Sequence, residues 1–150
     1  MPLDFTVIFS SRQHFGENPN ALGSDFPPGI FVGQAKDFSF DCPKLIEGET
    51  AFLLFESYNV GTPDDAFEVN GLGVFGGLTI NATFPFTWFG NILLLEPRHH
   101  LRTTGNVLHV ESKPHMGKLD EFVLDNMIIE YKALATPDRP PPPPPVLNRL

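Results

Sequence analysis

Proline and glycine interrupt this chain at intervals too short for long helices. The 150 residues include 16 Pro and 13 Gly, and both residue types tend to end helices and strands. Between them lie short runs of apolar and β-branched residues, and no segment has the spacing of a long amphipathic helix. The sequence therefore predicts an all-β protein built from short strands joined by turns.

Two apolar runs predict the most buried strands. Residues 50–60 are almost continuously apolar, which predicts a central strand covered on both faces. Residues 92–96 predict another buried strand, which Pro97 ends. The remaining strands are expected at residues 6–9, 30–32, 37–40, 66–69, 72–74, 78–80, 84–89 and 107–112, with two more between 122 and 132.

Local signals refine this assignment. Asn70-Gly71 is a strong turn signal and should end the strand at 66–69. Along 107–112, His109 and Glu111 should share one face of a strand while Leu108 and Val110 take the other. So many short strands predict an antiparallel β-sandwich or jelly roll. We expect one such domain over residues 1–135.

A proline-rich tail follows this domain over residues 136–150. Six consecutive prolines predict a polyproline II segment outside the sandwich: Pro140, Pro141, Pro142, Pro143, Pro144 and Pro145. Such a segment can dock into the aromatic-lined groove of a partner protein, strap neighbouring molecules together, or act as a spacer.

Charge and composition limit the classes of partner. The net charge is −8, and no Lys or Arg lies between Lys44 and Arg98, whereas residues 98–118 are cationic with the single acid Glu111. A net-acidic domain lacks the phosphate-neutralising surface that nucleic-acid binding requires.

No run approaches the roughly 18 apolar residues that span a bilayer, and the N-terminal residues lack a signal-peptide pattern. We expect a soluble chain that does not insert into membranes, cytoplasmic by default.

Cys42 is the single cysteine, so no intrachain disulfide is expected. Asp41 and Pro43 flank it, and an adjacent carboxylate raises a thiol pKa, so we expect it to be unreactive.

No G-x-S-x-G phrase supports a hydrolase. Residues 71–76 match G-x-G-x-x-G, but the β-branched residues that follow cannot begin the helix that a dinucleotide site needs. The sequence thus predicts a non-catalytic protein.

Three segments resemble the motifs of one fold family. Phe67-Glu68-Val69-Asn70-Gly71 is similar to a strand ending in V-N-G, residues 101–110 resemble L-x-x-G-x-N-x-L-x-V with one added residue, and 122–131 resemble its closing strand. Together they resemble galactose-binding-like jelly rolls, which include many non-catalytic sugar-binding modules. The resemblance covers about half of the chain, residues 67–132. It implies a binding module and allows a structural calcium ion of unassigned ligands.

The candidate ligand-binding residues are expected in loops at one end of the sandwich: Trp88, Arg98, His99, His100 and Arg102. An aromatic ring can stack on a sugar face while basic groups read its hydroxyls, so the predicted ligand is a carbohydrate or a similar polar molecule. Trp88 could instead close one end of the core. The histidines at 99, 100, 109 and 115, together with Glu111, could bind a metal only if a loop brought them together, and no cofactor is expected.

A structural function is the alternative. The acidic interval 44–98 of one copy could meet the cationic stretch 98–118 of another, with the proline-rich tail holding neighbours together in a homo-oligomer. The paired carboxylates Asp64-Asp65 and Asp120-Glu121 are expected to be exposed turn residues.

Overall fold

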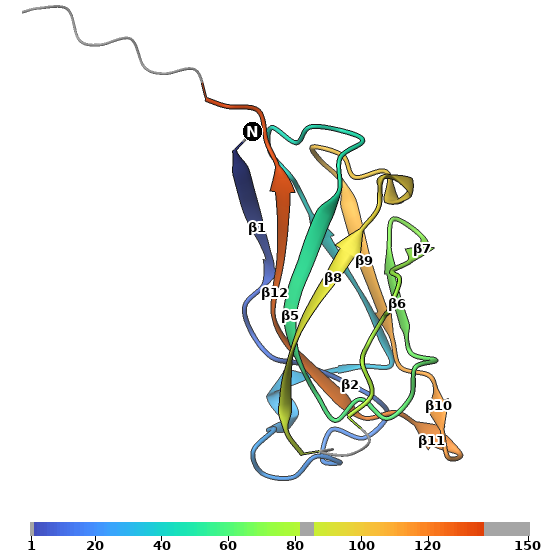
Figure 1. Cartoon of the computed structure of the whole chain (residues 1–150). Coiled ribbons are helices and arrows are strands. Elements are labelled where there is room, and N and C mark those ends of the chain that lie inside the picture. Colours follow the sequence, from blue (N-terminus) through green and yellow to red (C-terminus); the bar gives the residue numbers. More distant parts are fainter. Residues whose placement is uncertain (1, 82–85, 137–150) are drawn as a thin grey trace, which may run out of the picture.

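The computed structural model describes residues 2–81 and 86–136, and these form two β-sheets packed face to face (Figure 1). The all-β sandwich predicted from the sequence is confirmed. The proline run of the tail lies outside the described residues, as does part of the strand expected at 84–89. The strand expected at 78–80 does not form.

The larger sheet has six strands. Five of them follow the order β3-β2-β12-β5-β8. The sixth, β1, pairs with β12 on the same side as β2 but at a different part of that long strand. All pairs are antiparallel except β2 with β3. The strands of this sheet are β1 (Leu3–Phe9), β2 (Gln13–Phe15), β3 (Phe31–Gly33), β5 (Ala51–Tyr58), β8 (Trp88–Leu95) and β12 (Phe122–Lys132).

The smaller sheet has four antiparallel strands in the order β4-β9-β6-β7. A two-stranded hairpin and two short 3-10 helices complete the described elements. The elements are β4 (Ala35–Phe40), β6 (Ala66–Val69), β7 (Leu72–Gly73), β9 (Asn106–Glu111), β10 (Pro114–His115), β11 (Lys118–Leu119), η1 (Pro28–Ile30) and η2 (Pro97–His99).

The core lies between the two sheets and is rich in phenylalanine. Phe55 of β5 and Phe67 of β6 meet across the layers with ring centroids 5.2 Å apart, and Leu108 and Val110 of β9 are fully buried. The predicted alternation of β9 is confirmed, since His109 and Glu111 lie on its other, partly exposed face. Burial of these apolar side chains is the main stabilising contribution to the fold.

Three strands differ from the prediction. β5 is central, but it alternates between buried and exposed residues, so only one of its faces is covered. β8 lies at the edge of its sheet, where Ile92 is 71% exposed. Residues 122–132 form one strand instead of two. A bulge between Asp125 and Ile128, where Asn126 has φ 50°, shifts the pairing with β5, and the strand continues beyond it.

The long segment between β2 and η1 is attached to β12 through Glu121. Its carboxylate accepts hydrogen bonds from the backbone N–H groups of Glu17 (2.9 Å) and Asn18 (2.8 Å) and contacts Nε2 of the buried His14 at 2.7 Å. An added Cβ at Gly16 would overlap this carboxylate. Glu121 therefore anchors the N-terminal segment instead of lying in an exposed turn.

Candidate functional site

The predicted ligand-binding residues lie at two opposite ends of β8. Trp88 is the first residue of that strand, and residues 98–102 follow its last residue, Leu95. At about 3.3 Å per residue, the eight-residue strand separates them by more than 20 Å. The structure therefore brings His100 and Arg102 together in one cleft but does not place Trp88 near them.

Trp88 belongs to an aromatic cluster that closes its end of the sandwich. Its ring lies 5.3 Å from that of Tyr58 and 6.0 Å from that of the buried Phe26. The guanidinium of Arg12 lies over the Trp88 ring, 5.0 Å from its centroid. Because these neighbours occupy the indole, its contacts are those of a packing residue.

His99 and Arg98 also point away from a shared ligand site. His99 is fully buried, and its ring nitrogens contact the backbone oxygens of Glu96 and Gly73, both at 3.1 Å. The Arg98 guanidinium pairs with Glu96 at 2.6 Å and reaches the Gly73 carbonyl. Both side chains hold the η2 turn against the β6–β7 hairpin.

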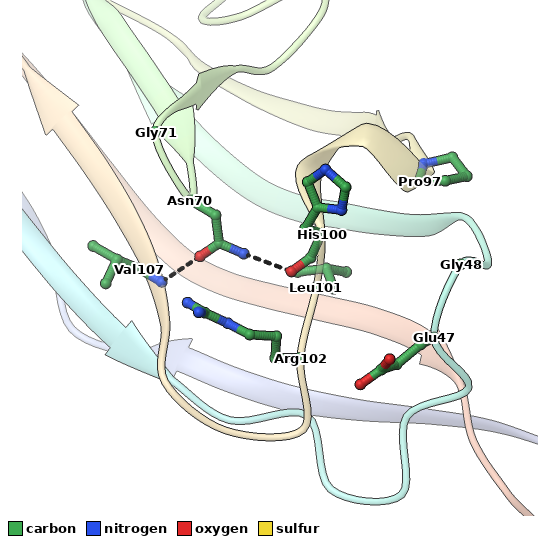
Figure 2. A pocket seen from close by; sticks show the side chains of 9 residues that line it. All are labelled: Glu47, Gly48, Asn70, Gly71, Pro97, His100, Leu101, Arg102 and Val107. Carbon is green, nitrogen blue, oxygen red and sulfur yellow. Dashed lines mark hydrogen bonds between the residues drawn. The ribbon is translucent and has the colours of Figure 1, made fainter.

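His100 and Arg102 line an open cleft of about 650 Å³ (Figure 2). Four segments meet there: the β4–β5 loop, the β6–β7 turn, the segment after η2, and the start of β9. The lining residues are Glu47, Gly48, Asn70, Gly71, Pro97, His100, Leu101, Arg102 and Val107. The cleft combines an apolar wall with a small number of polar side chains, as ligand sites commonly do.

Asn70 fixes the floor of the cleft. Its amide nitrogen donates to the carbonyls of His99 (3.0 Å) and His100 (3.3 Å), and its Oδ1 accepts from the N–H of Val107 at 3.0 Å. Asn70 has φ 52°, a left-handed conformation that Asn tolerates and that the tight β6–β7 turn requires. The turn signal in the sequence thus also places a polar group that links η2 to β9.

Asn106 supports the other side of the cleft from beneath. It is fully buried, its amide donates to the carbonyl of Arg102 at 2.7 Å, and its Oδ1 accepts from the Arg102 N–H at 2.9 Å. The Arg102 guanidinium donates to Gly105 at 2.7 Å. Residues 102–106 therefore form a rigid turn, and the Gly105-Asn106 phrase is structural.

The side chains that remain available in the cleft are a carboxylate, an imidazole and a guanidinium. Glu47, His100 and Arg102 are all exposed, and Figure 2 shows their side chains around the hollow. Within the described residues, Glu47 and His100 have no side-chain hydrogen-bond partner. The cleft lining contains no Ser, Thr, Cys or Lys. Such a set can donate and accept hydrogen bonds to a polar ligand.

Asp65 and Asp120 form a buried carboxyl pair that the sequence did not predict. Asp65 and Asp120 are 6% and 5% exposed, so the expectation of exposed turn residues is wrong for both. Burial, and then the neighbouring carboxyl of Asp120, raise the pKa of Asp65 to about 8. Oδ1 of Asp65 accepts from the Lys113 N–H at 2.8 Å, while its Oδ2 has no partner among the described residues. Nothing local in the sequence marks this long-range pairing.

Two basic residues of the cationic stretch, His109 and Lys113, are paired with acids of the same chain. His109 lies 2.6 Å from Asp37, and this hydrogen bond is the main reason that the pKa of His109 is raised. Lys113 pairs with Glu111 at 3.0 Å and lowers the pKa of that carboxylate. These acids offset the charge that His109 and Lys113 would offer to a second copy.

The structure also shows the surroundings of Cys42 and of the histidines considered as metal ligands. Cys42 is fully buried, and this burial, followed by the charge of Asp41, raises its thiol pKa to about 12. Across residues 2–81 and 86–136, no three His, Cys, Asp or Glu side chains are arranged to hold a metal ion. The histidines of the 98–118 stretch are not gathered into one cluster.

No protein family, curated protein or solved structure matches this chain. In the described part of the chain, no helix has the length and apolar character of a membrane span. Fold and site together define the class: a β-sandwich with an open cleft at one end, lined by an apolar wall and a few polar side chains.

Proposed function

We propose that this protein is a non-catalytic binding module whose ligand, a carbohydrate or a similarly polar molecule, occupies the cleft around Asn70. One observation carries the proposal: Glu47, His100 and Arg102 surround a hollow whose floor is held rigid by the Asn70 and Asn106 hydrogen bonds. A rigid floor lowers the entropy lost when a ligand binds. The resemblance to galactose-binding-like modules favours the same function.

The chemistry of the cleft suits a ligand with several hydroxyl groups. The Glu47 carboxylate accepts hydrogen bonds, Arg102 donates them, and the imidazole of His100 can do either. Pro97, Leu101 and Val107 provide an apolar surface for the C–H face of a sugar ring. The arrangement contains no aromatic platform, so hydrogen bonding supplies the specificity of the proposed site.

Binding can be tested by titrating glycans, selected on a glycan array, into the labelled protein while its NMR amide shifts are recorded. Shifts should concentrate at residues 47–48, 70–71 and 100–107. Arg102→Ala should weaken binding roughly tenfold or more, because it removes a charged hydrogen-bond donor. Lys118→Ala is the matched control, since Lys118 is an exposed cation on the β10–β11 hairpin, outside the cleft. An array without hits, or equal losses in both variants, would contradict the proposal.

A further inference from the structure

The edge of the larger sheet at β8 is open. β8 pairs with β5 on one side, from Ala51 opposite Leu95 to Tyr58 opposite Trp88. On its other side, no backbone hydrogen bond links it to any described residue. An edge of this kind presents a row of unpaired N–H and C=O groups, which another strand can satisfy.

β8 also lacks the features that usually protect an edge strand. Its eight residues contain no charged side chain and no proline, and its register with β5 has no bulge. Other edges are protected: β4 carries Lys36 and Asp37, β1 carries Asp4 and a bulge at Val7, and β3 and β7 are very short. Among the described edges, β8 is the long one without protection.

Apolar side chains surround this open edge. On the outer face of β8, Ile92 is 71% and Leu94 is 42% exposed, and Phe52 of the neighbouring β5 is 39% exposed. A partner strand at this edge would cover part of that surface. Removing it from water supplies a driving force in addition to the backbone hydrogen bonds.

The side-chain pattern of β8 is complementary to itself. In an antiparallel pair centred on Ile92, Leu94 of each strand lies opposite Gly90 of the other. An added Cβ at Gly90 would meet nothing within 4 Å, so the space beside it can accept the larger side chain. Two chains of net charge −8 repel each other, and an uncharged strand is where they can approach most closely.

We propose that β8 pairs with β8 of a second copy of this chain across a two-fold axis at Ile92, which joins the two larger sheets into one. The occupant of the edge is thus another molecule of the same protein. A single strand pair buries less than the roughly 800 Å² per partner of a standard interface. The dimer should therefore form at high protein concentration and dissociate on dilution.

Cysteine crosslinking tests both the contact and its symmetry. Residues directly opposite in an antiparallel pair have Cα atoms about 4.5 to 5.5 Å apart, within the range of a disulfide. Oxidised Ile92→Cys should therefore run as a covalent dimer on a non-reducing gel. Met116→Cys is the control, because Met116 is 92% exposed on the β10–β11 hairpin. The native Cys42 is fully buried and should not crosslink.

The register has its own test. Gly90→Cys and Leu94→Cys should each remain monomeric alone, because each residue lies far from its own copy. A mixture of the two variants should form a crosslinked heterodimer. Crosslinking of either variant alone to the extent of the mixture would overturn the proposed register.

Sedimentation equilibrium provides a readout without cysteines. The wild-type mass should rise toward twice the monomer mass with concentration, and Ile92→Lys should raise the dissociation constant at least tenfold by placing two ammonium groups opposite each other. Unchanged thermal unfolding would show that the variant still folds. High salt should not dissociate the dimer, because the contact is uncharged.

Several results would overturn the proposal. A wild type that stays monomeric at hundreds of micromolar, or a dimer that Ile92→Lys leaves intact, excludes this edge as the contact. Equal crosslinking of Ile92→Cys and Met116→Cys indicates random collision. Dissociation by salt, or by removal of residues 137–150, assigns assembly to charge or to the tail.

Discussion

At the scale of single residues, two asparagines in turns position the candidate site. Asn70 adopts the left-handed conformation of a β-hairpin turn and bonds to three backbone groups around the cleft. Asn106 is fully buried and closes the turn after Arg102 through its whole amide group. Each amide provides hydrogen-bond partners for backbone groups of the turns around the cleft.

Asn106→Ala should lower the free energy of unfolding by about 2–3 kcal/mol, because the N–H and carbonyl of Arg102 lose their partner. Chemical denaturation measures this change. Asn20→Ala is the control, since Asn20 lies exposed in the segment before η1 and its side chain has no described partner. Equal stability of the two variants would show that Asn106 does not hold the turn.

At the scale of secondary-structure elements, the two ends of β8 differ in what they contact: one packs in an aromatic cluster and the other leads to the cleft. Its first residue, Trp88, packs with Tyr58 and Phe26 under the guanidinium of Arg12. Its last residue, Leu95, is buried in the core and leads into η2, which carries the chain to the cleft. One strand thus connects a closed end of the sandwich to an open one.

Trp88→Ala should destabilise the fold by about 1–3 kcal/mol, because a half-buried aromatic side chain is removed from a packed cluster. The affinity of the cleft for the proposed glycan ligand should stay within twofold of the wild type, since Trp88 and the cleft lie at opposite ends of β8. Thermal unfolding and the glycan titration measure the two effects separately. Loss of binding at unchanged stability would instead assign Trp88 to the ligand site.

At the scale of the whole molecule, a buried carboxyl pair links the two sheets. Asp65 precedes β6 of the smaller sheet, and Asp120 comes two residues before β12 of the larger one. Asp120 accepts a hydrogen bond from Gly61 at 2.8 Å, and Asp65 accepts one from Lys113 at 2.8 Å. A proton on Asp65 removes the repulsion between two buried negative charges.

This pair should make stability fall as the pH rises. With a pKa of about 8 in the folded state, Asp65 retains a proton that the unfolded chain releases near pH 4, so folding binds a proton across this interval. The free energy of unfolding should therefore decrease between about pH 4 and pH 8 and level off above. Denaturation at a series of pH values measures this slope.

Asp65→Asn should flatten the slope, because an amide keeps the acceptor for Lys113 and has no carboxyl proton to lose. A smaller decrease should remain near neutral pH. It comes from His109, whose raised pKa contributes stability at low pH that is lost as the pH rises through it. A slope that is the same in the wild type and in Asp65→Asn would show that Asp65 is ionised in the folded protein.

Features that depend on residues close together in the sequence could be predicted, whereas features that depend on contacts between distant segments could not. The turn at Asn70-Gly71 and the two faces of β9 depend on neighbouring residues, and both were predicted correctly. Residues 92–96 were expected to be buried because apolar runs in central and edge strands look alike. His99 was expected to be accessible, but packing against the β6–β7 hairpin buries it completely.

The sequence by itself determined that this protein is a β-sandwich, because the spacing of proline, glycine and apolar runs restricts the chain to short strands. Only the tertiary structure decided that Trp88 and Arg102 lie apart, that Asp65 meets Asp120, and that β8 has an open edge. These features depend on which strands become neighbours. Strand order is set by the packing of the whole core, so no local pattern specifies it.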